Sequence, residues 1–213
     1  MSDSTADRLT RSRIVPVVTV RDPAHVDAIS AGLAEGGIRA IEVTLRTPHG
    51  LPAIRRLAAR GELEVGAGTV LDAHEAREVA DAGASFAVSP GLDEAVVEAS
   101  LERGLLSLPG IATASELQRA RSLGVRQVKV FPVEVLGGLR LLEALHGPFP
   151  DMALMPSGGV TPASAPGYLA HPAVFAVGGS WLVPGGEVGD LARVVRERAA
   201  ATVAALDHAA GRG

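Results

Sequence analysis

Short apolar runs alternate with amphipathic stretches along almost the whole chain, and this alternation restricts the possible folds more than any other feature. Eight apolar runs have the length of buried strands: Ile14–Val20, Ala40–Arg46, Leu63–Val70, Phe86–Pro90, Leu105–Pro109, Gln127–Val133, Ala153–Gly158 and Val174–Gly179. Each is followed by a segment that favours a helix. The pattern therefore predicts repeated strand–helix units around a parallel sheet.

Residues that begin and end helices support this interpretation. The helix boundaries are clearest in four segments: Asp22–Gly37, Asp72–Gly83, Leu92–Gly104 and Thr113–Gly124. Asp22, Asp72 and Thr113 are residue types that cap helix N-termini, and Glu116 follows Thr113 at the spacing of a capping box. All four segments end at glycine, which favours the left-handed conformation at a helix C-terminus.

Eight such units in a chain of 213 residues predict a single-domain (β/α)₈ TIM barrel, within the α/β class and near its minimum size. An open doubly wound sheet is less favoured because no Gly-x-Gly-x-x-Gly turn follows the first strand. We expect one barrel domain over residues 1–213, with residues 1–13 as a polar N-terminal extension and 191–209 as a long closing helix.

Composition narrows the possible partners. The net charge of −4 and the lack of a basic stripe argue against nucleic acid, and the absence of cysteine excludes disulfides and thiolate metal sites. No apolar run is long enough to span a membrane, and no signal-peptide pattern is present, so we expect a cytoplasmic protein. The six histidines are scattered without metal-ligand spacing, which predicts no metal site.

The chain contains a single lysine among twenty basic residues, and that lysine, Lys129, lies within an apolar strand. Burial disfavours the charged ammonium form and so favours the free amine, which can attack a carbonyl. Arginine cannot do this, because its guanidinium does not lose its proton in proteins. Lys129 is therefore a candidate nucleophile.

Strand alternation places two more polar residues on the same side as Lys129. In the second strand Ile41, Val43 and Leu45 form one face, while Glu42, Thr44 and Arg46 form the other. The polar face must point into the barrel if the apolar face packs on helices, so Glu42 and Lys129 should meet inside. Arg46 lies nearer the C-terminal mouth, where its planar fork could hold a carboxylate.

Glycines end the last two strands. The sequences Ser157-Gly158-Gly159 and Gly178-Gly179-Ser180 lie where barrels commonly bind phosphate, because backbone N–H groups there can approach an anion closely. These two loops predict a phosphate site at the mouth. Thr69 and Pro90 end two further strands and could form part of a pocket wall.

Several motifs together resemble the bacterial 2-keto-3-deoxy-6-phosphogluconate (KDPG) aldolase family, also called Entner–Doudoroff aldolases. The resemblance runs in order from about Ile14 to Pro184. The matching segments are Glu42–Thr47, Gly66–Val70, Ser89–Gly91, Pro109–Thr113, Lys129–Glu134 and Gly178–Pro184.

The resemblance implies a class I aldolase, usually a homotrimer, that needs no metal or cofactor and acts on a phosphorylated keto acid. It implies Lys129 as the Schiff-base lysine, Glu42 as the general acid/base and Arg46 as the carboxylate ligand. The remaining implied substrate contacts are Thr69, Pro90, Phe131, Ser157, Gly158, Gly159, Gly179 and Ser180. Ser157 and Val133 depart from the threonine and alanine that close relatives often have.

The expected reaction is cleavage of 2-dehydro-3-deoxy-6-phosphogluconate to pyruvate and glyceraldehyde 3-phosphate. Alternatives within the class are the galactonate-derived epimer and unphosphorylated 4-hydroxy-2-oxoglutarate (KHG). A phosphosugar isomerase or epimerase without an imine, and a non-catalytic phosphosugar-binding barrel, are the alternatives outside it.

Overall fold

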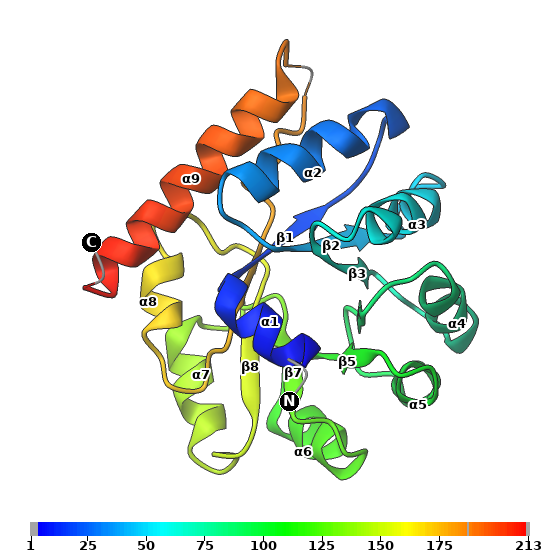
Figure 1. The fold of residues 1–213 in the computed structure, drawn as a ribbon. Coiled ribbons are helices and arrows are strands. Elements are labelled where there is room, and N and C mark those ends of the chain that lie inside the picture. The colour runs from blue at the N-terminus through cyan, green and yellow to red at the C-terminus, as the bar shows by residue number, and fades with distance from the viewer. Residues whose placement is uncertain (1–3, 187, 212–213) are drawn as a thin grey trace.

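Parallel strands curl into a ring with helices around it, as Figure 1 shows. The structure, a computed structural model, describes residues 4–186 and 188–211. Its strands are β1 (Ile14–Val18), β2 (Ala40–Thr44), β3 (Glu64–Gly68), β4 (Phe86–Val88), β5 (Leu106–Leu108), β6 (Gly110–Ile111), β7 (Gln127–Val130), β8 (Ala153–Pro156) and β9 (Val177–Gly179). The predicted (β/α)₈ barrel is confirmed.

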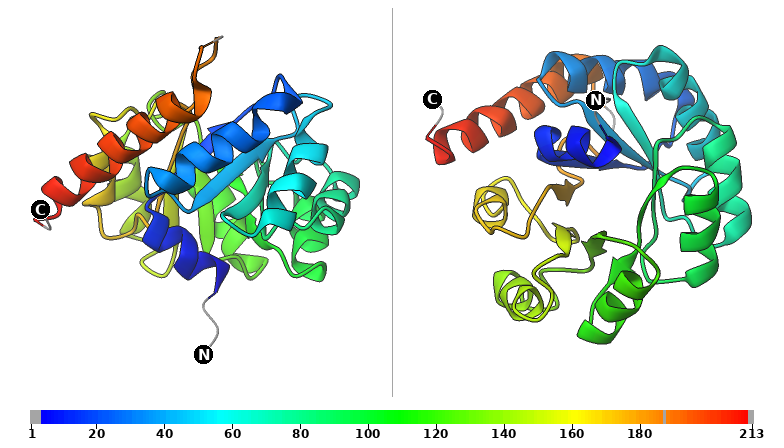
Figure 2. Two further views of the ribbon diagram at one scale, coloured as in Figure 1. Left: turned by 45° about the horizontal axis from the view of Figure 1, so that its top comes forward. Right: turned by 60° about the horizontal axis from the view of Figure 1, so that its bottom comes forward.

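Apart from the first, which precedes β1, the helices follow the strands in sequence and lie on the outside of the ring (Figure 2). They are α1 (Thr5–Ser12), α2 (Val26–Glu35), α3 (Gly50–Arg60), α4 (Ala73–Asp81), α5 (Glu94–Glu102), α6 (Ala114–Ser122), α7 (Leu139–His146), α8 (Ala165–Leu169) and α9 (Leu191–Ala209), with a 3₁₀ turn over Pro23–His25. The long closing helix predicted over residues 191–209 is confirmed as α9, which has the same bounds. Asp72 and Thr113 cap α4 and α6 as expected, and the Thr113 cap is a full capping box with Glu116.

Every strand pair is parallel, in the orders β5-β4-β3-β2-β1-β9 and β6-β7-β8. The bridges Leu154–Val174 and Ser157–Gly178 join the second group to the first. The fifth strand, predicted over Leu105–Pro109, is observed as β5 and ends before Pro109, which has no N–H to donate to a ladder; β6 follows directly after this proline. The eight expected strand positions are therefore all occupied.

Strand alternation divides the buried apolar side chains into two clusters. The larger lies between the strands and the helices and includes Ile41, Val43 and Val128. The smaller fills the inside of the ring and includes Val15, Phe86 and Met155. Their separation confirms the expected orientation of β2, with its polar residues facing inward.

The N-terminal segment has more structure than its polar composition suggests. Helix α1 starts at a capping box between Ser4 and Asp7, and it lies across the end of the ring opposite the strand C-termini (Figure 2). Its Leu9 is fully buried within the inner cluster. The extension predicted over residues 1–13 thus closes one end of the barrel, although residues 1–3 lie outside the described part of the chain.

Candidate active site

A buried lysine and a buried glutamate face each other inside the ring. Lys129 comes from β7 and Glu42 from β2, and the Lys129 Nζ donates a hydrogen bond to the Glu42 Oε1 at 3.3 Å. The exposed fractions of the two side chains are 5% and 0%. The meeting predicted from strand alternation therefore occurs, between residues 87 positions apart in sequence.

Glu42 has room for its carboxylate because Gly68, on the neighbouring strand β3, has no side chain. A Cβ on Gly68 would lie 2.2 Å from the Glu42 Oε1, which no real side chain could tolerate. The other oxygen, Oε2, is buried and has no hydrogen-bond partner among the described residues. A buried carboxylate oxygen without a partner costs free energy. Oε2 would therefore be stabilised by a hydrogen bond from a substrate hydroxyl or a water.

The ring of Phe131 and the side chains of Arg46 and Thr69 lie toward the mouth from this pair. The Lys129 Nζ is 5.3 Å from the centroid of the Phe131 ring. Arg46 is exposed, and its Nε donates to the Thr69 Oγ1 at 3.0 Å. Thr69 has a φ of 59°, a left-handed conformation that costs a β-branched residue energy. Such strain is common at functional sites, and here it accompanies the hydrogen bond that the Thr69 hydroxyl accepts from Arg46.

Pro90 lies two residues after the end of β4, next to the strand that begins after Pro109. Its carbonyl oxygen would lie only 2.2 Å from a Cβ on Gly110, so Gly110 allows this loop to approach β6 closely. Pro90 is exposed at the rim. The structure thus places it at the same end of the barrel as Thr69, as the sequence predicted.

The two glycine-rich loops lie side by side. Ser157 pairs with Gly178 in a parallel bridge, and a Cβ on Gly178 would lie 2.7 Å from the Ser157 Oγ. Gly158 and Gly159 have φ values of 86° and 91°. Within residues 4–186 and 188–211 no acceptor is found for the N–H groups of Gly159 and Ser180. Gly158 packs against the Phe131 ring and Gly179 against Trp181.

Free backbone N–H groups in left-handed turns form concave sites that suit anions. The arrangement therefore offers three parts in one mouth: a lysine–glutamate pair, an arginine at the rim, and a pair of loops with unpaired N–H donors. In the described part of the chain, no group of three or more His, Cys, Asp and Glu residues could hold a metal ion. No helix there is long and apolar enough to cross a membrane.

Comparison with known proteins gives the same family as the sequence motifs. The family described as KDPG and KHG aldolase matches residues 5–197. The 2-dehydro-3-deoxy-phosphogluconate aldolase of Pseudomonas aeruginosa is 46% identical over 188 residues, which cover 87% of this chain and 86% of the relative.

The chain belongs to the KDPG and KHG aldolase family.

Solved structures of this family superpose on the chain closely. The aldolase of Zymomonas mobilis ZM4, solved with 3-phosphoglycerate, has a TM-score of 0.87 and 37% identity and covers 94% of this chain and 96% of its own. The KDPG aldolase of Legionella pneumophila, which holds pyruvate as a covalent carbinolamine, has a TM-score of 0.89 and 32% identity, with coverages of 93% and 98%. The predicted enzyme class, a carbon–carbon lyase of the aldolase type, is therefore confirmed.

Two contacts of this aldolase were missed by sequence reasoning. Tyr168, buried on α8, donates to the Glu134 Oε1 at 2.7 Å, and burial followed by the Glu134 carboxylate raises the pKa of Tyr168. Glu134 also packs against Gly159. Thr19 and the fully buried Thr44 share a hydrogen bond of 2.8 Å between their hydroxyls. Thr44 was recognised as facing inward, but nothing in the sequence gave its partner.

Proposed function

We propose that the protein cleaves 2-dehydro-3-deoxy-6-phosphogluconate to pyruvate and glyceraldehyde 3-phosphate through a Schiff base on Lys129. The observation that carries this proposal is the Lys129–Glu42 pair, buried inside the ring with a separation of 3.3 Å. A nucleophilic amine must give up a proton, and Glu42 is close enough to take it. The pair therefore holds both groups that imine chemistry requires.

Imine formation is the first stage. The neutral amine of Lys129 attacks the C2 carbonyl of the substrate and forms a carbinolamine. Glu42 supplies the proton with which the carbinolamine hydroxyl leaves as water, and an iminium remains. Its positive charge withdraws electrons from the neighbouring carbon–carbon bond.

Cleavage and release follow. The Glu42 carboxylate takes the proton of the C4 hydroxyl and the C3–C4 bond breaks. Its electron pair forms a C2=C3 double bond while the C2=N pair moves to nitrogen, which gives the neutral enamine. The C4 fragment leaves as glyceraldehyde 3-phosphate. Protonation of C3 by Glu42 restores the iminium, and its hydrolysis releases pyruvate and the free amine. The unpartnered Glu42 Oε2 is the oxygen available for these transfers.

Substrate binding is assigned to the rim and the two loops. Arg46 holds the carboxylate, while Thr69, Pro90 and Phe131 form the wall around the pyruvate portion. Ser157, Gly158, Gly159, Gly179 and Ser180 bind the phosphate at the other end. The N–H groups of Gly159 and Ser180, which have no acceptor among the described residues, support this assignment. Binding energy from the phosphate would fix the C4 hydroxyl near Glu42 and so speed the bond cleavage.

The proposal is tested by trapping the imine. The protein is incubated with pyruvate and reduced with borohydride, and its peptides are mapped by mass spectrometry. We expect one carboxyethyl group on Lys129. Since Lys129 is the only lysine, Lys129→Arg is a clean control in which no side-chain amine remains. A folded protein that cleaves substrate but gives no adduct at Lys129 would overturn the mechanism.

A second candidate substrate is unphosphorylated 4-hydroxy-2-oxoglutarate, because the matching family is described for both KDPG and KHG aldolases. The same imine steps apply to it, but the two glycine loops would bind nothing. The ratio of kcat/KM values for the two substrates decides between them. A homotrimeric assembly and a cytoplasmic location remain part of the proposal, and light scattering of the purified protein tests the first.

A further inference from the structure

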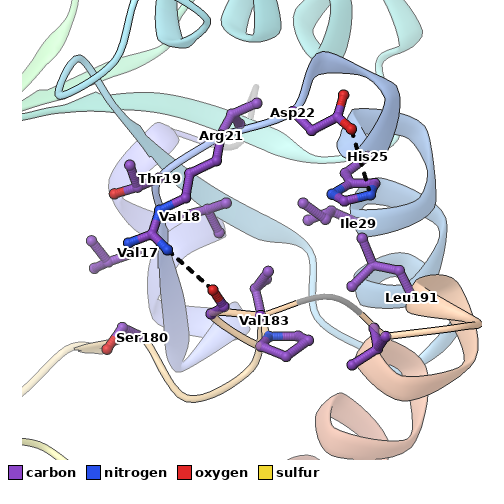
Figure 3. A pocket seen from close by; sticks show the side chains of 15 residues that line it. Val17, Val18, Thr19, Arg21, Asp22, His25, Ile29, Ser180, Val183 and Leu191 are labelled. Atoms are coloured by element: carbon purple, nitrogen blue, oxygen red, sulfur yellow. Dashed lines mark hydrogen bonds and ion pairs between the residues drawn. The ribbon is translucent and has the colours of Figure 1, made fainter.

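A cavity at the mouth lies beside the proposed phosphate loops rather than between them. It has a volume of about 540 Å³ and separates the end of β1 from the segment that joins β9 to α9 (Figure 3). Thr19 and Arg21 line it from the β1 side, and Ser180, Val183 and Gly185 line it from the other side. Ser180 thus belongs both to the proposed phosphate site and to this cavity.

Arg21 is directed into the cavity. In Figure 3 its guanidinium lies between Thr19 and the segment that carries Ser180. Its Nη1 donates to the carbonyl oxygen of Gly185 at 3.1 Å, and no other hydrogen bond or ion pair joins this guanidinium to residues 4–186 or 188–211. A guanidinium carries five N–H donors, so most of the fork has no acceptor among the residues that the structure describes.

The neighbouring acidic residue does not neutralise this arginine. The Asp22 Oδ1 accepts a hydrogen bond from the Ala24 N–H, and its Oδ2 lies 3.9 Å from the His25 Nε2. Figure 3 shows the Asp22 side chain turned toward His25 and away from Ser180. The cavity therefore has a positive guanidinium on the side that faces Ser180.

The proposed phosphate site otherwise contains no positive side chain. Its donors are the N–H groups and the serine hydroxyls of the two glycine loops. In the proposed mechanism Lys129 forms the imine, and Arg46 binds the carboxylate at the opposite end of the substrate from the phosphate. A phosphate held by neutral donors alone is bound less tightly than one that also accepts charge-assisted hydrogen bonds from an arginine fork.

We propose that Arg21 is the cationic ligand of the substrate's distal phosphate and determines the preference for phosphorylated over unphosphorylated substrates. This inference rests on the proposed function. Arg21 would bind the phosphate from the β1 side with the free arms of its fork, while Nη1 keeps its hydrogen bond to Gly185. Phosphate binding would then join β1, the Ser180 turn and the segment before α9.

The experiment compares Arg21→Gln with wild type on KDPG and on 4-hydroxy-2-oxoglutarate. Glutamine can still donate to the Gly185 carbonyl, so the variant removes the charge and the fork. We expect KM for KDPG to rise about 10- to 100-fold, because a hydrogen bond to a charged group is worth that much. KM for 4-hydroxy-2-oxoglutarate should stay within about 2-fold. Arg21→Lys should recover part of the loss.

Arg198→Gln is the matched control. The Arg198 Nη1 also donates to a carbonyl of the segment after β9, that of Trp181 at 2.9 Å, but it lines a different cavity. This variant should leave both KM values unchanged. Equal losses on both substrates, the same effect in Arg198→Gln, or an unchanged KM for KDPG in Arg21→Gln would each overturn the role of Arg21.

Two further readouts separate this inference from the proposed function. Borohydride trapping of pyruvate should mark Lys129 equally in wild type and in Arg21→Gln; failure in wild type counts against the Schiff-base proposal alone. Calorimetric titration with inorganic phosphate requires no turnover and should show weaker binding in Arg21→Gln. Equal phosphate affinity in the two proteins would reject Arg21 as the ligand, whatever the reaction is.

Discussion

Two pairs of a cation and a glutamate lie toward opposite ends of the barrel, one buried and one partly exposed, and they are built in opposite ways. Toward the mouth, Lys129 contacts only one oxygen of Glu42. At the other end, Arg8 of α1 binds both oxygens of Glu64 on β3, through Nε to Oε2 and through Nη2 to Oε1, the latter at 2.9 Å. Glu42 and Glu64 lie on neighbouring strands.

This difference separates a reactive pair from a structural one. In the Arg8–Glu64 pair the carboxylate is saturated by a planar fork and the arginine cannot release a proton, so the pair can only hold α1 against the barrel. In the Lys129–Glu42 pair both groups can exchange protons, and a buried oxygen is left without a partner. Burial of such a pair contributes little stability, because desolvation offsets the attraction.

The largest expected effect comes from making the reactive pair resemble the structural one. Lys129→Arg keeps the positive charge beside Glu42 but removes the only amine that can form an imine. We expect turnover of KDPG to fall by about 10⁴-fold or more, since a covalent step is lost. A coupled assay for pyruvate measures this, and circular dichroism checks the fold. Residual pyruvate formation above about one per cent of wild type would contradict the Schiff-base mechanism, because cleavage would then proceed by acid–base chemistry without an imine on Lys129.

Glu42→Gln tests the other half of the reactive pair. Glutamine has the same shape and can accept the hydrogen bond from Lys129, but it cannot take up or release a proton. We expect kcat to fall by about 10²- to 10⁴-fold, the usual contribution of general acid–base catalysis. Glu64→Gln is the matched control on the adjacent strand, and its kcat should equal that of wild type. Similar losses in both variants would contradict the division between the two pairs.

Gly68→Ala tests whether the position of Glu42 matters as well as its chemistry. The new Cβ would meet the Glu42 Oε1 at 2.2 Å, so the carboxylate must move. A displacement of about 1 Å can cost about 10²-fold in rate, and we expect kcat to fall by about 10- to 100-fold. The control is Gly189→Ala, where a Cβ meets nothing within 4 Å. An unchanged kcat in Gly68→Ala would show that the site tolerates a shifted carboxylate.

The two pairs also show how far sequence reasoning reaches. Alternation of apolar and polar residues along β2 and β7 was enough to predict that Glu42 and Lys129 meet, because side-chain direction in a strand has a period of two. The Arg8–Glu64 pair could not be predicted. Arg8 lies in a polar segment whose one buried anchor, Leu9, gives too weak a pattern to fix a helix or its docking face. Arg21 was missed for a similar reason, since it follows β1 in a turn where no periodicity sets the direction of a side chain.

The smallest expected effect lies at the structural pair and concerns stability alone. Burial acts to raise the pKa of Glu64, but the hydrogen bonds from Arg8 and its charge outweigh it and hold that pKa below the ordinary value of 4.5. A carboxyl whose pKa is lowered in the folded state stabilises the fold above its unfolded pKa. That contribution is lost as the pH falls from about 4.5 through the folded pKa.

Glu64→Gln should therefore lower the free energy of unfolding at pH 7 by about 1 kcal/mol. The value is kept small because the Arg8 side chain is 38% exposed and solvent screens its charge. Urea titrations at pH 7 and pH 3 measure it, and the difference between wild type and variant should shrink at pH 3. If the difference persists unchanged at pH 3, ionisation of Glu64 is not what joins α1 to the barrel. The packing of Leu9 then accounts for closure of that end, and charge at the structural pair is incidental to the fold.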